Sequence, residues 1–295
     1  MTAARTKRMP LRCQLVTPGA SVKMIEKAAA LRCDGLVLDL EDSVTPAMKP
    51  AARDVVRQAL QGTDFGETEV AVRVNAVGTA WFGEDVAALQ DADIDALVLS
   101  KAETARDVHV ADYFLERMEC RSGQGIALYL LIESGAGLER ISDLIGVSPR
   151  CAGVIFGAAD FAASTGVAFN ARGLAYARSR LSAAAAAAGI QALDQVHPKI
   201  DDDAGLEVEV RHAREIGYTG KWAIHPRQVE IITKVFSPTP EEIEEAHRIL
   251  RLNDAMLGAG RGAVAEDGML VDEAVIKIMR RRLAAVAGPA KGELP

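Results

Sequence analysis

The 295-residue sequence lacks the features that mark several classes of protein. Basic residues are not in excess: the formal net charge is −7, which argues against nucleic acid as a partner. No uninterrupted apolar run approaches the roughly 18 residues of a membrane-spanning helix. Residues 1–10 are charged and carry no apolar segment of a secretory signal, so we expect a disordered tail.

Cysteine is scarce and unpaired in the sequence. Its four residues, Cys13, Cys33, Cys120 and Cys151, form no CxxC pair. This pattern disfavours a disulfide framework or a cysteine metal site and predicts a reducing, cytoplasmic location. The sequence also contains no P-loop, GxGxxG or GxSxG motif, which removes the common signatures of nucleotide-binding proteins and serine hydrolases.

One pattern recurs along the chain: a short apolar run, a polar residue at its end, and then an Ala- and Leu-rich stretch. The runs are continuous in hydrophobicity, which predicts strands buried on both faces of a parallel sheet. Eight such units predict an α/β fold, a (β/α)₈ TIM barrel over residues 1–236; a doubly wound open sheet is the alternative. The runs are Gln14–Thr17, Gly35–Leu40, Glu69–Val74, Ala96–Ser100, Ile126–Ile132, Gly153–Phe156, Gln191–Val196 and Lys221–Ile224.

Helices are predicted between these runs. The clearest is the alanine-rich stretch that ends at Gly189, because alanine favours helix and glycine favours the residue just beyond a helix end. The predicted helices are Ser21–Leu31, Lys49–Leu60, Thr104–Arg121, Ala171–Ala188 and Leu206–Ile216.

The pattern changes after the eighth run. Thr239, Pro240 and Glu242 have the spacing of a helix start, and this helix is predicted to run to about Leu257. A glycine-rich link and a last helix, Asp272–Val286, follow. We therefore expect residues 237–295 to form a C-terminal helical extension that packs on a neighbouring subunit.

Ionisable residues follow almost every predicted strand. In a barrel the carboxyl ends of all strands share one face, and burying so many charges for structure alone would be costly. The sequence thus predicts a site at this face. The ionisable residues are Asp39, Glu41, Asp42, Arg73, Lys101, Glu103, Glu133, Asp160, Asp194, His197 and His225, and the uncharged Asn75 also lies at the end of the third run.

Glu133 and Asp160 follow neighbouring strands, and Mg²⁺ commonly takes one or two protein carboxylates. The alternatives are a helix N-cap for either residue or an ion pair for Glu133. Arg73 is placed to bind a substrate carboxylate or to stabilise an oxyanion, and it is equally placed to pair with the acids of Asp39–Asp42.

Lysine and histidine chemistry is disfavoured. Lys101 could form a Schiff base if desolvated, but the nearby Glu103 is expected to keep it protonated. His225 precedes a proline, where a structural hydrogen-bond donor is the expected role, and His197 is interpreted in the same way.

Several motifs resemble one known family. Gly35–Val44 reads GLVLDLEDSV and is followed by Lys49 and Ala52-Arg53, which is similar to the "DLEDaV…K…AR" signature of the citrate lyase β-subunit-like proteins of the HpcH/HpaI aldolase superfamily. Further matches occur in the same order as in that family, from about Arg12 to the last helix. They are Val72–Thr79, Leu131–Ser134, Gly157–Phe161, Ile224–Gln228 and Gly268–Asp272.

The resemblance implies a TIM barrel that assembles as a trimer or dimer of trimers. It implies a carbon–carbon lyase that depends on Mg²⁺, with Mn²⁺ as a substitute, and that cleaves 3-hydroxyacyl-CoA thioesters such as malyl-CoA or citramalyl-CoA to an acyl-CoA and a 2-oxoacid. Glu133 and Asp160 match the metal ligands, and Glu133 also faces substrate. Arg73 matches the arginine on the substrate oxygens.

The same resemblance assigns supporting roles. Asp272 matches an aspartate that a neighbouring subunit delivers to the site, where it is expected to handle a proton. Glu41 and Asp42 are expected to hold metal-bound water and Arg73. The residues that contact CoA are not identifiable.

Two departures leave the substrate open. Ser100 stands where the family usually has proline, and Leu270-Val271 differs mildly from the common form. A thioesterase and a catalytically silent assembly subunit remain as alternatives, the second disfavoured by the intact candidate residues.

Overall fold

The computed structural model describes residues 10–31, 33–118, 125–258, 263–266 and 269–285. The predicted tail up to residue 9, Cys120 and most of the glycine-rich link therefore lie outside the described residues.

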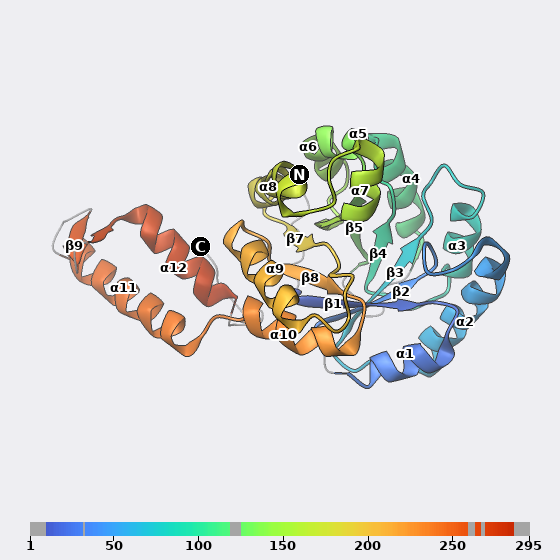
Figure 1. The fold of residues 1–295 in the computed structure, drawn as a ribbon, viewed down its shortest axis with the longest axis horizontal. Coiled ribbons are helices and arrows are strands. Elements are labelled where there is room, and N and C mark those ends of the chain that lie inside the picture. Colours follow the sequence, from blue (N-terminus) through green and yellow to red (C-terminus); the bar gives the residue numbers. More distant parts are fainter. Residues whose placement is uncertain (1–9, 32, 119–124, 259–262, 267–268, 286–295) are drawn as a thin grey trace.

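Eight parallel strands close into a barrel in sequence order, which confirms the predicted TIM barrel and excludes the open sheet (Figure 1). Each strand pairs with its neighbours in the chain, and β1 closes the ring on β8. Every predicted apolar run corresponds to one strand. The strands are β1 (Cys13–Pro18), β2 (Gly35–Asp39), β3 (Glu69–Val74), β4 (Ala96–Leu99), β5 (Ala127–Ile132), β6 (Cys151–Phe156), β7 (Gln191–Asp194) and β8 (Gly220–Ala223).

Alternation along the strands builds two apolar layers. Residues such as Val37, Ala71 and Trp222 pack with one another inside the barrel. Their strand neighbours, such as Leu36 and Val70, pack in the larger core beneath the helices. Both faces are thus buried, which is why the runs are continuously apolar in the sequence.

Helices surround the barrel (Figure 1). The helix predicted for Ala171–Ala188 has those bounds and ends at Gly189, whose φ of 66° is left-handed. The helix predicted to reach Arg121 ends earlier, at Leu115. The sequence missed the short helices α3 (Phe82–Ala88), α5 (Gly135–Glu139), α6 (Ile141–Val147) and α7 (Ala158–Thr165), and also α10 (Pro226–Phe236). The other helices around the barrel are α1 (Val22–Ala29), α2 (Lys49–Gly62), α4 (Ala105–Leu115), α8 (Ala171–Ala188) and α9 (Asp203–Glu215).

The C-terminal extension stands beside the barrel as a helical hairpin (Figure 1). It consists of α11 (Pro240–Gly258), the strand pair β9 (Val264–Glu266) and β10 (Met269–Val271), which the sequence did not predict, and α12 (Glu273–Ala284). Thr239 and Glu242 form the predicted reciprocal cap, each backbone N–H donating to the other's side chain (2.9 and 3.2 Å). Within the described ranges, none of the helices combines the length and the apolar character that a bilayer span requires.

A buried ionic network joins β7 and β8 to the helices outside them. Asp194 and Lys221 have no exposed side-chain surface and pair at 2.9 Å. Arg178 of α8 also binds Asp194 at 2.8 Å, and Glu209 of α9 pairs with Lys221. The prediction that Asp194 belongs to the site was therefore wrong, because its side chain points outward beneath α8.

This network predicts a stability effect. Lys221→Ala leaves Asp194 and Glu209 short of a buried cation, and breaking such a pair costs about 3–5 kcal/mol of unfolding free energy. Urea denaturation measures it. Lys199→Ala, at an exposed lysine on the loop after β7, is the control and is expected to stay within about 0.5 kcal/mol of wild type. A loss below about 1 kcal/mol for Lys221→Ala would contradict this prediction.

Candidate active site

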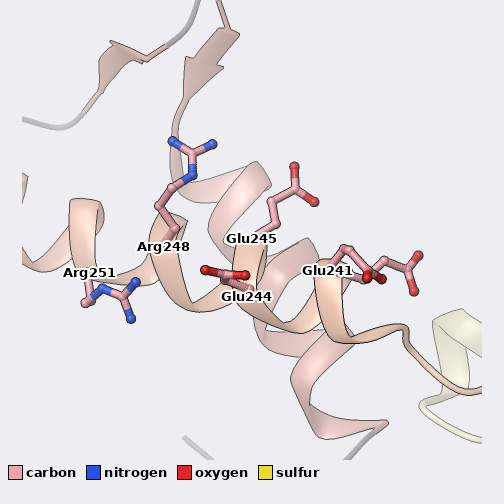
Figure 2. A pocket seen from close by; sticks show the side chains of 6 residues that line it. Glu241, Glu244, Glu245, Arg248 and Arg251 are labelled. Carbon is pink, nitrogen blue, oxygen red and sulfur yellow. The ribbon is translucent and has the colours of Figure 1, made fainter.

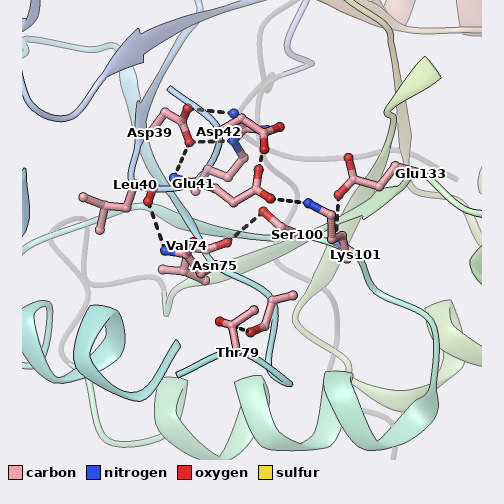
Figure 3. Close-up of polar contacts among 12 residues, drawn as sticks. Asp39, Leu40, Glu41, Asp42, Val74, Asn75, Thr79, Ser100, Lys101 and Glu133 are labelled. Carbon is pink, nitrogen blue, oxygen red and sulfur yellow. Dashed lines mark hydrogen bonds and ion pairs between the residues drawn. The ribbon is translucent and has the colours of Figure 1, made fainter. Parts of the chain in front are cut away.

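Charged side chains gather where β2 to β6 end, at the end of the barrel that we call the mouth. Figure 3 shows those that follow β2, β4 and β5. Asp39 ends β2, Arg73 lies near the end of β3, Lys101 follows β4 and Glu133 follows β5. Asp160 lies in the first turn of α7, after β6. The structure thus brings together most of the residues that the sequence proposed for the site.

Asp39 and Arg73 form a buried bidentate pair. Arg73 Nε and Nη2 donate to the two carboxylate oxygens at 2.6 and 2.7 Å. Asp39 also accepts the backbone N–H groups of Glu41 and Ser43, at 2.8 and 3.0 Å. Burial opposes ionisation of Asp39, but the hydrogen bonds and charge of Arg73 outweigh it and lower the pKa of Asp39. The alternative in which Arg73 pairs with the acids after β2 is confirmed.

The third nitrogen of the Arg73 guanidinium faces the other two acids after β2. Its Nη1 lies 3.2 Å from Glu41 Oε2 and 3.5 Å from Asp42 Oδ2. The guanidinium also stands 5.5 Å from the ring centroid of Trp222, whose indole N–H donates to Gln14 at 2.8 Å. Trp222 and Gln14 were not predicted to belong to the site, because their interior positions on β8 and β1 follow only from strand register.

Lys49, a residue of the family-like signature, supports the loop after β2. Its buried ammonium donates to the carbonyl oxygens of Leu40 and Glu41 at 2.9 and 3.0 Å. A third bond, at 2.7 Å, reaches Asn75 Oδ1. Lys49 therefore acts on the shape of the loop and not on a ligand.

Arg53, the other basic residue of the signature, also supports this region, through Asp85 and Asn75. It binds the fully buried Asp85 at 2.7 Å, and Asp85 accepts the backbone and side-chain N–H groups of Asn75 at 2.9 and 2.6 Å. Asp85 was missed because it lies inside a helix, α3, that the sequence did not predict.

Glu41 and Lys101 form the second ion pair of the mouth. Glu41 is 7% exposed, its Oε1 accepts the Lys101 ammonium, and its buried Oε2 has no hydrogen bond. Burial raises the pKa of Glu41. Burial alone would lower the pKa of Lys101, but the hydrogen bond and charge of Glu41 raise it. Lys101 is therefore held protonated as predicted, although its partner is Glu41 and not Glu103.

The backbone of Lys101 has a φ of 52°, and no other non-glycine residue in the described part of the chain has a positive φ. This conformation costs about 1–3 kcal/mol. It directs the backbone N–H of Lys101 at Glu133 Oε1, 2.8 Å away.

Glu133 and Asp160 lie near enough to influence one another. Glu133 is 4% exposed, and burial raises its pKa to about 8, with the charges of Glu41 and Asp160 adding to the rise and Lys101 opposing it. Gly157 packs against Glu133, since a Cβ there would stand 2.7 Å from Glu133 Oε2.

Neither carboxylate caps a helix. Gly157 is the N-cap of α7, and Ser134, which accepts the Gly137 N–H at 3.1 Å, is the N-cap of α5. The N-cap alternative was therefore wrong for both Asp160 and Glu133. Within the described ranges, no hydrogen bond or ion pair to the Asp160 carboxylate is found.

This pair fits a hard divalent cation. No cluster of three His, Cys, Asp or Glu side chains able to hold a metal occurs in the part of the chain that the structure describes. Mg²⁺ needs only one or two protein carboxylates, because water and substrate oxygens complete its six ligands. Two neighbouring carboxyl groups, one of them buried, offer the oxygen ligands that such an ion requires, and a bound cation would favour their ionised forms.

The remaining candidates serve other elements. His225 caps α10, where its Nδ1 accepts the Arg227 N–H at 3.3 Å; the role is structural as predicted, but it is that of an acceptor. His197 pairs with Glu209 of α9 at 3.1 Å. Asp272 caps α12 by accepting the N–H groups of Ala274 and Val275 at 2.9 and 3.1 Å, and it lies in the extension beside the barrel (Figure 1).

A separate hollow lies on α11 of the extension, and Figure 2 shows the charged side chains that surround it. None of its residues was predicted to belong to a site. They are Glu241, Glu242, Glu244, Glu245, Arg248 and Arg251.

A parallel barrel with ionised side chains at the carboxyl ends of its strands defines the class of TIM-barrel enzymes. The chain belongs to the HpcH/HpaI aldolase/citrate lyase family, whose model matches residues 12–226. The family resemblance and the lyase class predicted from the sequence are thereby confirmed.

Two curated relatives illustrate the family. The chain is 34% identical to the L-malyl-CoA/beta-methylmalyl-CoA lyase of Cereibacter sphaeroides (strain ATCC 17029 / ATH 2.4.9) over 292 residues, 91% of this chain and 92% of that protein. It is 33% identical to the citrate lyase subunit beta of Escherichia coli (strain K12) over 270 residues, 90% and 89% of the two chains.

Solved structures share the fold. The protein CitE of Mycobacterium tuberculosis, in complex with magnesium, acetoacetate and coenzyme A, is 31% identical with a TM-score of 0.78, covering 95% of this chain and 98% of that one. A citrate lyase of Burkholderia xenovorans LB400 is 25% identical with a TM-score of 0.80, covering 97% and 95%. Magnesium and coenzyme A, which the sequence predicted, are thus groups that a structural neighbour holds.

The raised pKa of Glu133 predicts a pH-dependent stability in Mg²⁺-free protein. Between the ordinary value of 4.5 and about 8, the folded carboxyl keeps a proton that the unfolded chain has released, so stability falls as pH rises through this window. Urea unfolding in EDTA across the window measures it.

Glu133→Gln should flatten this contribution, because an amide does not titrate. Glu139→Gln, at an exposed position on α5, is the matched control and should leave the slope unchanged. Equal slopes in wild type and Glu133→Gln would contradict the prediction.

Proposed function

We propose that this chain is a Mg²⁺-dependent carbon–carbon lyase that cleaves a 3-hydroxyacyl-CoA thioester, such as malyl-CoA or citramalyl-CoA, to an acyl-CoA and a 2-oxoacid. The observation that carries the proposal is the uncompensated carboxylate pair, Glu133 and Asp160, at the mouth that also holds the fixed Arg73. The names of the malyl-CoA lyase relative and of the magnesium- and coenzyme A-bound neighbour support it.

Glu133 and Asp160 would hold the metal. When bound, Mg²⁺ supplies Lewis-acid activation of the substrate hydroxyl and carboxylate. Glu133 Oε1 is already engaged by the Lys101 N–H, so Oε2 is its oxygen left for the ion. Glu41 and Asp42, on the loop after β2, would orient water around it.

Arg73 would stabilise negative charge on the substrate. Asp39 occupies Nε and Nη2, and Nη1, which lies 3.2 Å from Glu41 and 3.5 Å from Asp42, would turn to a substrate oxygen. The pair is rigid before a ligand arrives, so little reorganisation is needed as charge develops. In the cleavage, the bond between the carbinol carbon and the thioester α-carbon breaks, and its electron pair passes to the thioester as an enolate.

Asp272 of a neighbouring subunit would take the hydroxyl proton and return it to the α-carbon of the enolate, which gives the acyl-CoA and restores the carboxylate. Apolar side chains of the extension favour such an assembly: Leu257, Leu270 and Ile278 are 57–64% exposed in the single chain. We therefore propose a homotrimer or a dimer of trimers, in which residues 237–295 reach the next barrel, acting in the cytoplasm.

The activity is tested by giving the purified protein malyl-CoA and citramalyl-CoA with and without Mg²⁺ and measuring free acyl-CoA, 2-oxoacid and thiol. We expect metal-dependent 2-oxoacid and acyl-CoA. Asp160→Ala should reduce kcat by at least about 10²-fold, because it removes a metal ligand.

Asp143→Ala, at an exposed carboxylate in the first turn of α6, is the matched control and should leave turnover unchanged. Free thiol without 2-oxoacid would instead indicate a thioesterase. Mg²⁺ binding without turnover of either thioester would contradict the proposed substrates and favour the silent assembly subunit.

The shared site is tested by complementation. Arg73→Ala and Asp272→Ala homo-oligomers should each be inactive, because each lacks one half of every site. A mixed assembly, refolded or co-expressed, should regain about a quarter or less of wild-type activity through sites that combine intact halves. Mass measured by light scattering gives the oligomeric state, and a mixture without any gain would argue that Asp272 does not act across subunits.

A further inference from the structure

We propose that Lys101 is a positioning residue that fixes two carboxylates of the mouth at once, Glu133 through its backbone N–H and Glu41 through its ammonium. The inference rests on the proposed function, since it concerns how the metal-binding carboxylates are aimed. Figure 3 shows the two contacts diverging from one residue.

The left-handed backbone of Lys101 is the first observation. Non-glycine residues rarely adopt a φ of 52°, and lysine has no short side chain to stabilise that conformation locally. Such a conformation persists only where its surroundings over-determine it.

Both neighbours of Lys101 are held in place. Ser100 Oγ donates to the Val74 carbonyl at 2.8 Å, and the Ala102 N–H donates to the Leu131 carbonyl at 3.3 Å. Gly137 of α5 lies against Ala102, because a Cβ at residue 137 would stand 2.6 Å from the Ala102 carbonyl oxygen. The turn is thus clamped from β3, β5 and α5, and Lys101 must adopt the conformation that these contacts impose.

The consequence lies in the oxygens that Lys101 does not touch. Glu133 Oε1 is occupied by the N–H, so the direction of Oε2 is set. Glu41 Oε1 is occupied by the ammonium, and its Oε2 lies 3.2 Å from Arg73 Nη1. One residue therefore links the proposed metal ligand to the arginine proposed to bind substrate, and its cation lies beside two carboxylates that would otherwise repel.

Lys101→Gly separates these functions. Glycine adopts a positive φ without strain and keeps the N–H to Glu133, but it removes the ammonium from Glu41. Lys101→Arg keeps a cation. Mg²⁺ affinity is measured by calorimetry, and kcat and KM are measured with the thioester substrate.

For Lys101→Gly we expect Mg²⁺ affinity and kcat each to fall about 10–100-fold, the range for residues that orient metal ligands. KM should stay near wild type and Lys101→Arg should recover most of kcat. Lys199→Gly, at the exposed loop lysine, is the control and should change neither quantity.

A double mutant tests whether Lys101 acts through Glu41. If Lys101 acts through Glu41, Lys101→Gly with Glu41→Gln should be no slower than the slower single variant. If the fold-losses in kcat of the two single variants multiply in the double mutant, Lys101 does not act through Glu41. Wild-type kcat and Mg²⁺ affinity in Lys101→Gly would overturn the proposal. The calorimetric test needs no substrate. If the wild type binds Mg²⁺ but cleaves no thioester, the proposed function is refuted and the role of Lys101 can still be tested by Mg²⁺ affinity. If the wild type does not bind Mg²⁺, both proposals are refuted.

Discussion

The buried ion pair between Asp39 and Arg73 is the constraint on which the site depends. A guanidinium inside a barrel is costly unless it is paired and hydrogen-bonded, and the bidentate contact meets both conditions. Asp39 can do this only because the loop after β2 folds back to give it two backbone N–H groups. Lys49 in turn holds the carbonyl oxygens of that loop. The residues of the signature that resembles the family therefore serve to hold Arg73 in place.

Charge balance explains why the mouth favours a cation. Asp39 neutralises Arg73, and Glu41 neutralises Lys101. Glu133 and Asp160 then remain without an ion-pair partner of their own in the described part of the chain. Burial is the main cause of the raised pKa of Glu133, and the charges of Glu41 and Asp160 add to it. A divalent cation carries the two positive charges that the pair lacks. A bound cation would also lower the pKa of Glu133, because an adjacent positive charge favours the ionised carboxyl.

The sequence predicted the barrel well because strands buried on both faces are apolar without interruption, and eight such runs are hard to misread. It also brought Arg73, Glu133 and Asp160 to one face, because parallel strands end together. The direction in which each side chain points was harder to predict from the sequence. Asp194 also follows an apolar run, yet it points beneath the helices and pairs with Arg178 and Lys221.

Contacts between distant segments account for the other differences. Glu103 is the nearest acid to Lys101 in the chain, but the ammonium meets Glu41, which lies on the loop after β2, two strands away from β4 in the barrel. No local pattern encodes such a pairing. The β9–β10 pair was missed because strands of three residues carry too little periodicity to be distinguished from a loop.

The engagement of the mouth carboxylates bears on where the proton acceptor comes from. Asp39 is saturated by four donors, Glu41 is held by Lys101, and Glu133 is engaged by a backbone N–H and assigned to the metal. A base must be able to approach the substrate hydroxyl while remaining ionised, and none of these three meets that requirement. Asp272 is ionisable and lies on an extension that has its own small core. Its Oδ1 accepts two backbone N–H groups, which hold the side chain in place. Delivery of such a group by another subunit would make assembly a condition for catalysis, and it gives the exposed apolar residues of the extension a functional reason.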